Sequence, residues 1–149
     1  LVYMEEAYPN ILFAKDGEIY NFHGKKVMAI GGAYSVDKYY RISHKMPWFD
    51  TEQPDDRIMN YVEQQLEKEG WSIDIILSHT VPIEAEPTWA FIPGLNQRTV
   101  DKSTEKWLQE IYDNLEISEW YAGHYHVDSE ENGIRIMFED YDEICEKLN

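Results

Sequence analysis

The spacing of apolar residues along the chain predicts two amphipathic helices. In the range 55–69 they recur three or four residues apart, at Ile58, Met59, Val62 and Leu66. Aspartates open this range and Gly70 follows it, as helix start and stop signals require. A second helix is predicted from about Ser103, where Asp101 can accept hydrogen bonds from the first free backbone amides. Its inner stripe consists of Trp107, Leu108, Ile111 and Leu115.

Shorter apolar runs predict strands. The range 26–30 ends at two glycines, and the range 72–78 is typical of a strand buried on both faces. The ranges 10–14 and 18–22 flank Asp16-Gly17, a signal that predicts a two-residue hairpin between them. The chain therefore begins with a mainly antiparallel arrangement and continues with strands that alternate with helices.

The C-terminal part predicts a further pair of strands. The first precedes Gly123-His124-Tyr125-His126, and the second, 134–138, is predicted to return antiparallel to it after a turn at Asn132-Gly133. We therefore expect an α/β fold with a mixed sheet. The chain has no internal repeat or flexible linker, so residues 1–149 are expected to form a single domain or part of one.

The connection between His79 and Asp101 predicts an irregular loop over the ends of the strands. It contains three prolines and a glycine, at Pro82, Pro87, Pro93 and Gly94. Trp89 and Phe91 within it have two interpretations, contact with a substrate or anchoring of the loop by burial of apolar area.

Net charge and cysteine content narrow the function classes. The formal charge of −16, with acidic residues thickened from Glu139 to Glu146, opposes binding to nucleic acid. The sequence has no secretory signal and no apolar run that could cross a bilayer. The lone Cys145 cannot form an internal disulfide. These features predict a cytoplasmic protein that does not associate with a membrane.

Three histidines are candidate metal ligands because they follow predicted strands. His79 stands where the strand 72–78 ends, and ligands of open α/β sheets gather at the carboxyl ends of strands. If the next strand stays extended, His124 and His126 share a face, roughly 6.5 Å apart at Cα. That separation suits two metal ions about 3.5–4 Å apart. The alternative is that these histidines are polar residues emerging into solvent.

A second candidate site follows the two glycines of the segment GGAYSVDKYYR, residues 31–41. Adjacent glycines allow close backbone approach or positive φ. Arg41 is a candidate bidentate clamp for a phosphate oxygen, with Asp37 near the same pocket. The alternative is a tight turn in which Asp37 pairs with Arg41.

Taken together, these segments resemble the calcineurin-like metallophosphoesterases, in a branch found in bacteria and phages. His79 in SHTVP is similar to the family's lone histidine after a strand, and GHYH at 123–126 is similar to its Gly-His-x-His signature. The resemblance extends to 31–41, to PWFDTEQP at 47–54 and to DKSTEKWL at 101–108, and so covers nearly the whole chain.

The resemblance implies the C-terminal half of an α/β sandwich with two divalent metal ions. His79 and His124 would coordinate one ion and His126 the other, and imidazole ligands suit Mn, Fe, Zn, Ni or Co. The family's Asp-x-His, Gly-Asp-x-x-Asp and Gly-Asn-His-Asp/Glu motifs are not in this sequence. We therefore expect these motifs in an upstream half of the domain. That half would be a partner of this fragment, and the fragment alone is expected to be inactive.

The implied activity is hydrolysis of a phosphate ester, as a phosphatase or phosphodiesterase. One alternative is a diadenosine-polyphosphate or nucleotide hydrolase of the same superfamily. Another is a non-catalytic fragment or interaction module, in which apolar area left uncovered by the absent half drives formation of a homodimer.

Overall fold

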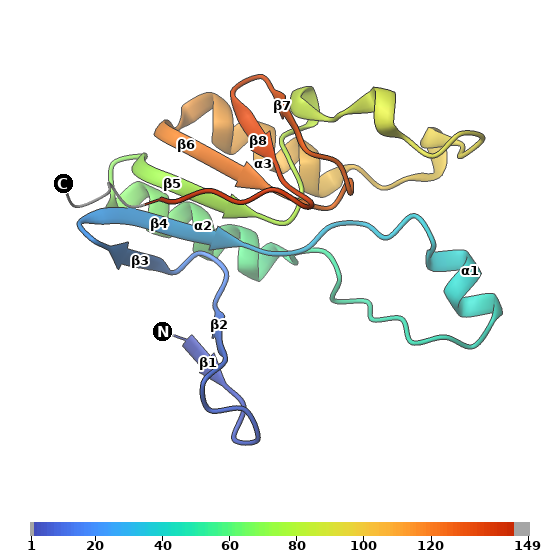
Figure 1. Cartoon of the computed structure of the whole chain (residues 1–149), viewed down its shortest axis with the longest axis horizontal. Helices are drawn as coiled ribbons and strands as arrows, with labels where there is room; N and C mark the ends of the chain where they lie inside the picture. Colours follow the sequence, from blue (N-terminus) through green and yellow to red (C-terminus); the bar gives the residue numbers. More distant parts are fainter. Residues whose placement is uncertain (1, 145–149) are drawn as a thin grey trace.

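Three mutually parallel strands lie side by side in the sheet, and a segment that contains a helix separates each of them from the next along the chain. These are β4 (Lys25–Ile30), β5 (Ser72–Ser78) and β6 (Glu116–Ala122). A computed structural model, which describes residues 2–144, places them in a six-stranded sheet of order β3-β4-β5-β6-β8-β7 (Figure 1). Within those residues the protein is α/β, with this mixed sheet, a small two-stranded sheet and three helices.

The remaining elements flank the central strands, cover them or extend away from them. The other strands are β1 (Val2–Met4), β2 (Leu12–Ala14), β3 (Ile19–Phe22), β7 (Ser129–Glu131) and β8 (Ile134–Ile136). The helices are α1 (Lys38–Ser43), α2 (Asp56–Lys68) and α3 (Ser103–Asn114). Three short 3₁₀ turns lie between β5 and α3, namely η1 (Ile83–Ala85), η2 (Thr88–Ala90) and η3 (Gln97–Thr99).

Both long helices begin where the sequence predicts. The Asp55 side chain accepts a hydrogen bond from the Ile58 amide at 2.9 Å, and Asp101 accepts one from the Ser103 amide at 2.9 Å. The two helices lie on one side of the sheet and share one hydrophobic core with it (Figure 1). Their predicted inner residues Val62, Leu66, Trp107, Leu108, Ile111 and Leu115 are all buried in this core.

The predicted hairpin at Asp16-Gly17 is wrong. β2 pairs with β1, while β3 pairs with β4 across a turn at His23-Gly24. The Asp16 carboxylate accepts a hydrogen bond from the Gly31 amide at 2.6 Å, and the Gly17 amide donates to the Ala29 carbonyl at 2.9 Å. These bonds hold Asp16-Gly17 against the end of β4, so the chain does not reverse there.

The predicted direction of the last strand is also wrong. β8 runs parallel to β6 and antiparallel to the short β7. The chain bends away after β6 and returns as β7, so the turn at Asn132-Gly133 joins β7 to β8. Both turn residues have positive φ, 50° and 75°, as a tight hairpin of this type requires.

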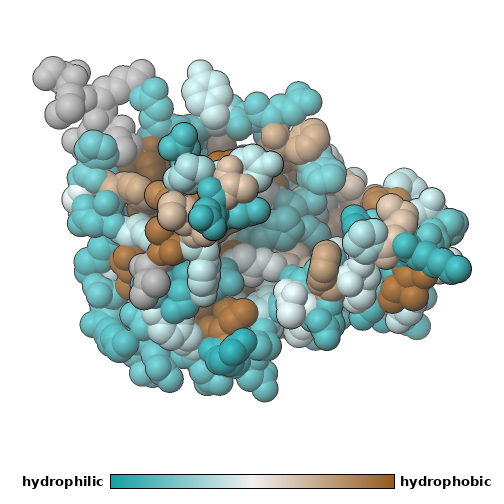
Figure 2. Space-filling model, turned by 90° about the horizontal axis from the view of Figure 1, so that it is seen from below, coloured by the Kyte–Doolittle hydropathy of each residue, from teal (hydrophilic) through white to brown (hydrophobic). Residues whose placement is uncertain are grey.

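Two segments extend away from the body of the protein. One is the ribbon of β1 and β2, and the other is the arm of residues 31–55 that carries α1 (Figure 1). Large apolar side chains are exposed on both, and Figure 2 shows hydrophobic patches on this side of the molecule. On the ribbon they are Val2, Tyr3, Met4, Tyr8, Ile11, Leu12 and Phe13, and on the arm Tyr39, Tyr40, Ile42, Met46 and Phe49.

Two sequence-based predictions concern the C-terminal residues and the membrane. Cys145 and Glu146 lie outside the described residues, so the structure does not test the predictions made for them. Within residues 2–144, the helices are too short and too polar to cross a membrane.

Candidate functional site

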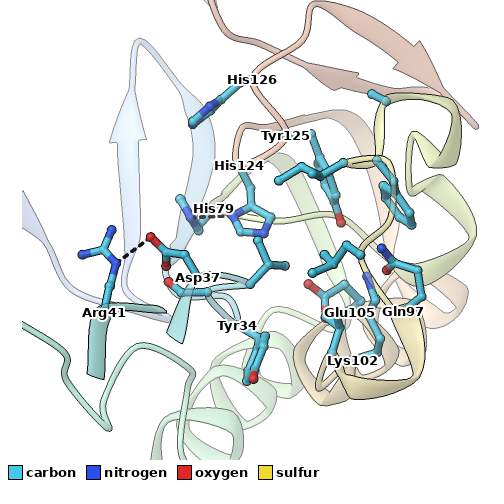
Figure 3. Close-up of a pocket in the computed structure, with 17 residues that line it drawn as sticks. Tyr34, Asp37, Arg41, His79, Gln97, Lys102, Glu105, His124, Tyr125 and His126 are labelled. Carbon is cyan, nitrogen blue, oxygen red and sulfur yellow. Dashed lines mark hydrogen bonds and ion pairs between the residues drawn. The ribbon is translucent and has the colours of Figure 1, made fainter. Parts of the chain in front are cut away.

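His79 and His124 are brought together by the ends of two adjacent parallel strands. The His79 amide donates to the Ile30 carbonyl of β4 at 2.9 Å, and the Gly123 amide donates to the His79 carbonyl at 3.1 Å. This backbone ladder fixes both histidines relative to the sheet. His79 Nε2 lies 3.2 Å from His124 Nδ1, and the two rings meet edge to face (Figure 3).

His126 does not share a strand face with His124, so the prediction of an extended strand through Gly123-His124-Tyr125-His126 is wrong. β6 ends at Ala122, and φ is 71° at His124 and 55° at His126. The Tyr125 amide donates to the Gly123 carbonyl at 2.9 Å, which closes a tight turn. The His126 ring lies apart from the other two and stacks on Phe138, with 5.0 Å between the ring centroids (Figure 3).

Burial keeps the adjacent pair of imidazoles neutral. It lowers the pKa of His124 to about 4, with further contributions from His79, Lys102 and His126. Burial and the neighbouring His126 also lower the pKa of His79, while Glu52 acts in the opposite direction. The neutral imidazole is the form that coordinates metal ions.

The geometry of the pair suits two ligands of one ion. Two nitrogens each about 2.0–2.1 Å from a tetrahedral zinc ion lie roughly 3.3 Å from one another. The 3.2 Å between His79 Nε2 and His124 Nδ1 is close to this value. Among the described residues, however, no three His, Cys, Asp or Glu side chains converge as a metal site. The described residues therefore bring together two potential ligands of one ion and not a complete set.

Tyr125 connects the two histidine segments through hydrogen bonds of its hydroxyl group. Its hydroxyl lies 3.2 Å from Thr80 Oγ1 and donates to Glu86 Oε1 at 3.1 Å. Lys102 pairs with the same Glu86 oxygen, and Thr80 Oγ1 donates to Glu105 Oε1 at 3.0 Å. This buried network holds the residue after His79 against the residue between His124 and His126.

Sequence reasoning missed this network. Tyr125 and Lys102 fall within the motifs GHYH and DKSTEKWL, but the sequence gives them no role of their own. Glu86 and Glu105 carry no spacing signal, since their proximity arises only when the loop after β5 packs on α3.

Glu105 is the most constrained carboxyl group in the network. Glu105 is only 2% exposed, and its Oε2 atom has no hydrogen-bond partner among residues 2–144. Burial raises its pKa, against the lowering effects of its own backbone amide, Thr80 and Lys102, and Glu86 raises it further. The folded protein therefore favours the protonated acid.

We expect Glu105→Gln to show a pH-dependent effect on stability. A raised pKa in the folded state means that the wild type loses stability as pH rises above the carboxyl's ordinary pKa. Glutamine keeps an acceptor for Thr80 and, like the protonated acid, leaves the group at the Oε2 position unpaired, so the two proteins should have similar stability at low pH. The free energy of unfolding of the wild type should therefore fall relative to that of Glu105→Gln as pH rises above the carboxyl's ordinary pKa.

Urea unfolding at a series of pH values measures the effect. Glu110→Gln is the matched control, because Glu110 lies exposed on the same helix. A difference between wild type and Glu105→Gln that stays constant with pH would contradict the raised pKa.

Asp37 and Arg41 pair with each other at the edge of the pocket. Arg41 Nε donates to Asp37 Oδ2 at 2.7 Å across one turn of α1, which is the predicted local ion pair. Both residues also line the pocket that contains the histidines (Figure 3). The pairing through Nε leaves the two terminal guanidinium nitrogens without a partner among the described residues.

The two glycines before this segment allow the close approach that the sequence predicts. Gly32 has φ of 92°, and a Cβ atom there would lie 2.7 Å from the Glu52 carbonyl oxygen. The Ala33 amide donates to the same carbonyl at 2.9 Å. This contact directs the arm so that residues 34–37 form one wall of the pocket.

The pocket has a volume of about 650 Å³ and two chemically different sides. Arg41 and Asp37 lie on one side, with His79 and His124 in the middle and Gln97, Lys102, Glu105 and Tyr125 opposite (Figure 3). Apolar residues of the loop after β5 also line the pocket, namely Ala90, Phe91, Ile92, Leu95 and Val100. Such a volume is typical of small-molecule sites.

A scan against models of protein families and a search of curated proteins gave no match to this chain.

Proposed function

We propose that this chain is part of a metal-dependent phosphoesterase, a phosphatase or phosphodiesterase with a site for two divalent ions. The observation that carries the proposal is the pair of imidazole nitrogens 3.2 Å apart at the carboxyl ends of adjacent parallel strands. The resemblance of the histidine motifs to calcineurin-like metallophosphoesterases supports the same activity. It also supports assignment of the sheet to the C-terminal half of that family's sandwich.

The chain's own residues have distinct roles in this proposal. His79 and His124 hold one ion as neutral ligands, and His126 serves a second ion after its ring turns from Phe138. The free guanidinium nitrogens of Arg41 bind phosphate oxygens, while Asp37 fixes the orientation of its side chain. Divalent ions, when bound, supply positive charge that polarises the phosphoryl group and activates water.

The remaining ligands are proposed to come from another polypeptide segment. A tetrahedral site needs four ligands, and the adjacent histidines supply two. An upstream half of the domain with carboxylate and amide ligands would complete both coordination shells. The ions themselves can be Mn, Fe, Zn, Ni or Co, because all accept imidazole nitrogen.

Metal binding by the 149-residue chain tests the proposal directly. We expect Co²⁺ to bind and to change the absorbance of the sample. Binding should release few protons at neutral pH, because both imidazoles are already neutral. His124→Gly should weaken binding at least about tenfold. Glycine is chosen because φ at this position is 71°.

His23→Gly is the matched control for this experiment. His23 is an exposed histidine in a turn with φ of 52°, so its replacement changes the backbone in the same way without touching the pocket. Hydrolysis of p-nitrophenyl phosphate and bis-p-nitrophenyl phosphate is then measured with the chain joined to the upstream segment proposed above. Equal Co²⁺ binding by wild type and His124→Gly would overturn the proposed site.

The exposed apolar residues of the β1–β2 ribbon favour a second candidate, a non-catalytic interaction module. An isolated two-stranded ribbon is marginally stable in water, and this one leaves Leu12 60% and Met4 61% exposed. Sedimentation velocity in the same buffers distinguishes the two. Self-association without uptake of Co²⁺ would favour the module over the phosphoesterase.

A further inference from the structure

The side of the pocket opposite Arg41 is suited to a flat ligand ring. Phe91 and Tyr125 line it with their rings nearly parallel, at 16° between planes and 6.1 Å between centroids. Ile92, Leu95 and Val100 line the same pocket. An aromatic ligand ring can lie against such a surface and replace water on it.

One polar group on this side is free to recognise a ligand. Gln97 is half-buried and lines the pocket, and its side-chain amide makes no hydrogen bond within residues 2–144 (Figure 3). A glutamine amide presents a donor and an acceptor side by side, and this pattern matches the edge of a nucleobase. A purely aliphatic ligand would leave both groups unpaired at a cost in free energy.

This side of the pocket also carries little net charge. Lys102 is paired with Glu86, and the exposed fractions of the two side chains are only 18% and 8%. An apolar surface with neutralised charge removes water from hydroxyl groups without replacing their hydrogen bonds. It therefore disfavours a sugar phosphate or a charged peptide and favours an uncharged aromatic group.

The aromatic side is held in place by contacts at the back of the loop. Trp89 Nε1 donates to Glu131 Oε1 at 2.9 Å, Asn132 Nδ2 donates to the Glu84 carbonyl at 2.6 Å, and the Glu84 amide donates to Gln109 Oε1 at 3.1 Å. These bonds fix the part of the loop that precedes Phe91, at Glu84 and Trp89, to α3 and to the β7–β8 hairpin. The entry to the aromatic side is thus held before any ligand binds, which limits the entropic cost of binding.

From these features we infer that Phe91, Gln97 and Tyr125 form a subsite for the nucleobase of a nucleotide. The inference rests on the proposed function in one respect, that the phosphate of the same ligand faces His79, His124 and Arg41. The substrate class would then be phosphate esters with a nucleoside as the leaving group.

Nucleoside binding to the 149-residue chain without metal tests the subsite on its own. Adenosine and uridine are titrated by NMR, with ribose 5-phosphate as the ligand that lacks a base. We expect both nucleosides to bind more tightly than ribose 5-phosphate. Phe91→Ala should weaken nucleoside binding about tenfold, because it removes one stacking surface.

A further variant and two controls complete the experiment. Gln97→Leu should reduce the difference in affinity between adenosine and uridine, because it removes the group that reads the base edge. Phe22→Ala and Gln64→Leu change exposed residues of β3 and α2 and should leave binding unchanged.

The outcomes separate this inference from the proposed function. Nucleosides that bind no better than ribose 5-phosphate, or that bind Phe91→Ala as well as wild type, would overturn the subsite. Hydrolysis of base-free phosphate esters as fast as nucleotides would overturn the substrate class and leave the phosphoesterase intact. Nucleoside binding together with absent Co²⁺ uptake would support the subsite and count against the phosphoesterase.

Discussion

Replacing Trp120 with alanine is expected to lower the free energy of unfolding by about 3–5 kcal/mol, the cost of removing a large side chain from a packed core. Trp120 is 2% exposed and lies on β6 in the centre of the sheet. Its ring also meets Tyr112 edge to face, with centroids 5.8 Å apart. Urea unfolding followed by circular dichroism measures the loss.

Trp89→Ala is the control, because the same side chain is 66% exposed there and its loss should cost within about 1 kcal/mol. If the two alanine variants lose similar stability, Trp120 is not the core residue that its burial indicates.

Trp120→Phe separates packing from hydrogen bonding near the site. Trp120 Nε1 donates to Ser78 Oγ at 2.7 Å, and Ser78 Oγ donates to the Thr80 carbonyl at 2.5 Å. Ser78 and Thr80 flank His79, so these two hydrogen bonds connect the backbone around His79 to the buried Trp120. Phenylalanine keeps most of the ring but removes the first bond, so it should cost less stability than alanine.

The fold was predictable where one local signal determined an element. The helices α2 and α3 combine apolar spacing with an aspartate just before the first turn whose side chain accepts a hydrogen bond from a backbone amide of that turn. The strand β5 is a run of apolar residues between a helix and a histidine loop. In each case the residues that carry the signal lie close together in the sequence and within the same element.

Strand pairing was not predictable where distant residues decide it. Asp16-Gly17 has the composition of a hairpin turn, but the Asp16 carboxylate is taken by the amide of Gly31. The direction of β8 depends on the bend at His124 to His126, where two residues other than glycine adopt positive φ. Apolar alternation identifies a strand but carries no information on its partner.

The candidate site was predictable in part for the same reason. His79 and His124 each follow a strand, and adjacent parallel strands bring such residues together at one edge of the sheet. The geometry of His126 required knowledge of the turn. The network of Tyr125, Glu86 and Lys102 depends on how an irregular loop packs on a helix. The periodicity of apolar residues in the sequence does not predict such packing.

Replacing Lys102 with methionine is expected to destabilise the protein by about 3–5 kcal/mol, because it leaves a buried carboxylate without its counter-charge. Glu86 then keeps the Tyr125 hydroxyl as its only side-chain partner among the described residues, at 3.1 Å. Lys102 Nζ also lies 4.9 Å from the centroid of the Phe91 ring, so the aromatic side of the pocket loses a contact as well. Urea unfolding of the variant measures the total effect.

A double variant shows whether the lost charge or the lost packing is responsible. Lys102→Met with Glu86→Gln removes both charges and keeps an acceptor for Tyr125, so most of the stability should return. Lys106→Met is the matched control, since Lys106 is exposed on the same helix. Equal losses in the single and the double variant would assign the effect to packing of the lysine's aliphatic chain against Phe91. A recovery in the double variant would assign it to the charge pair that fixes the loop beside the histidines.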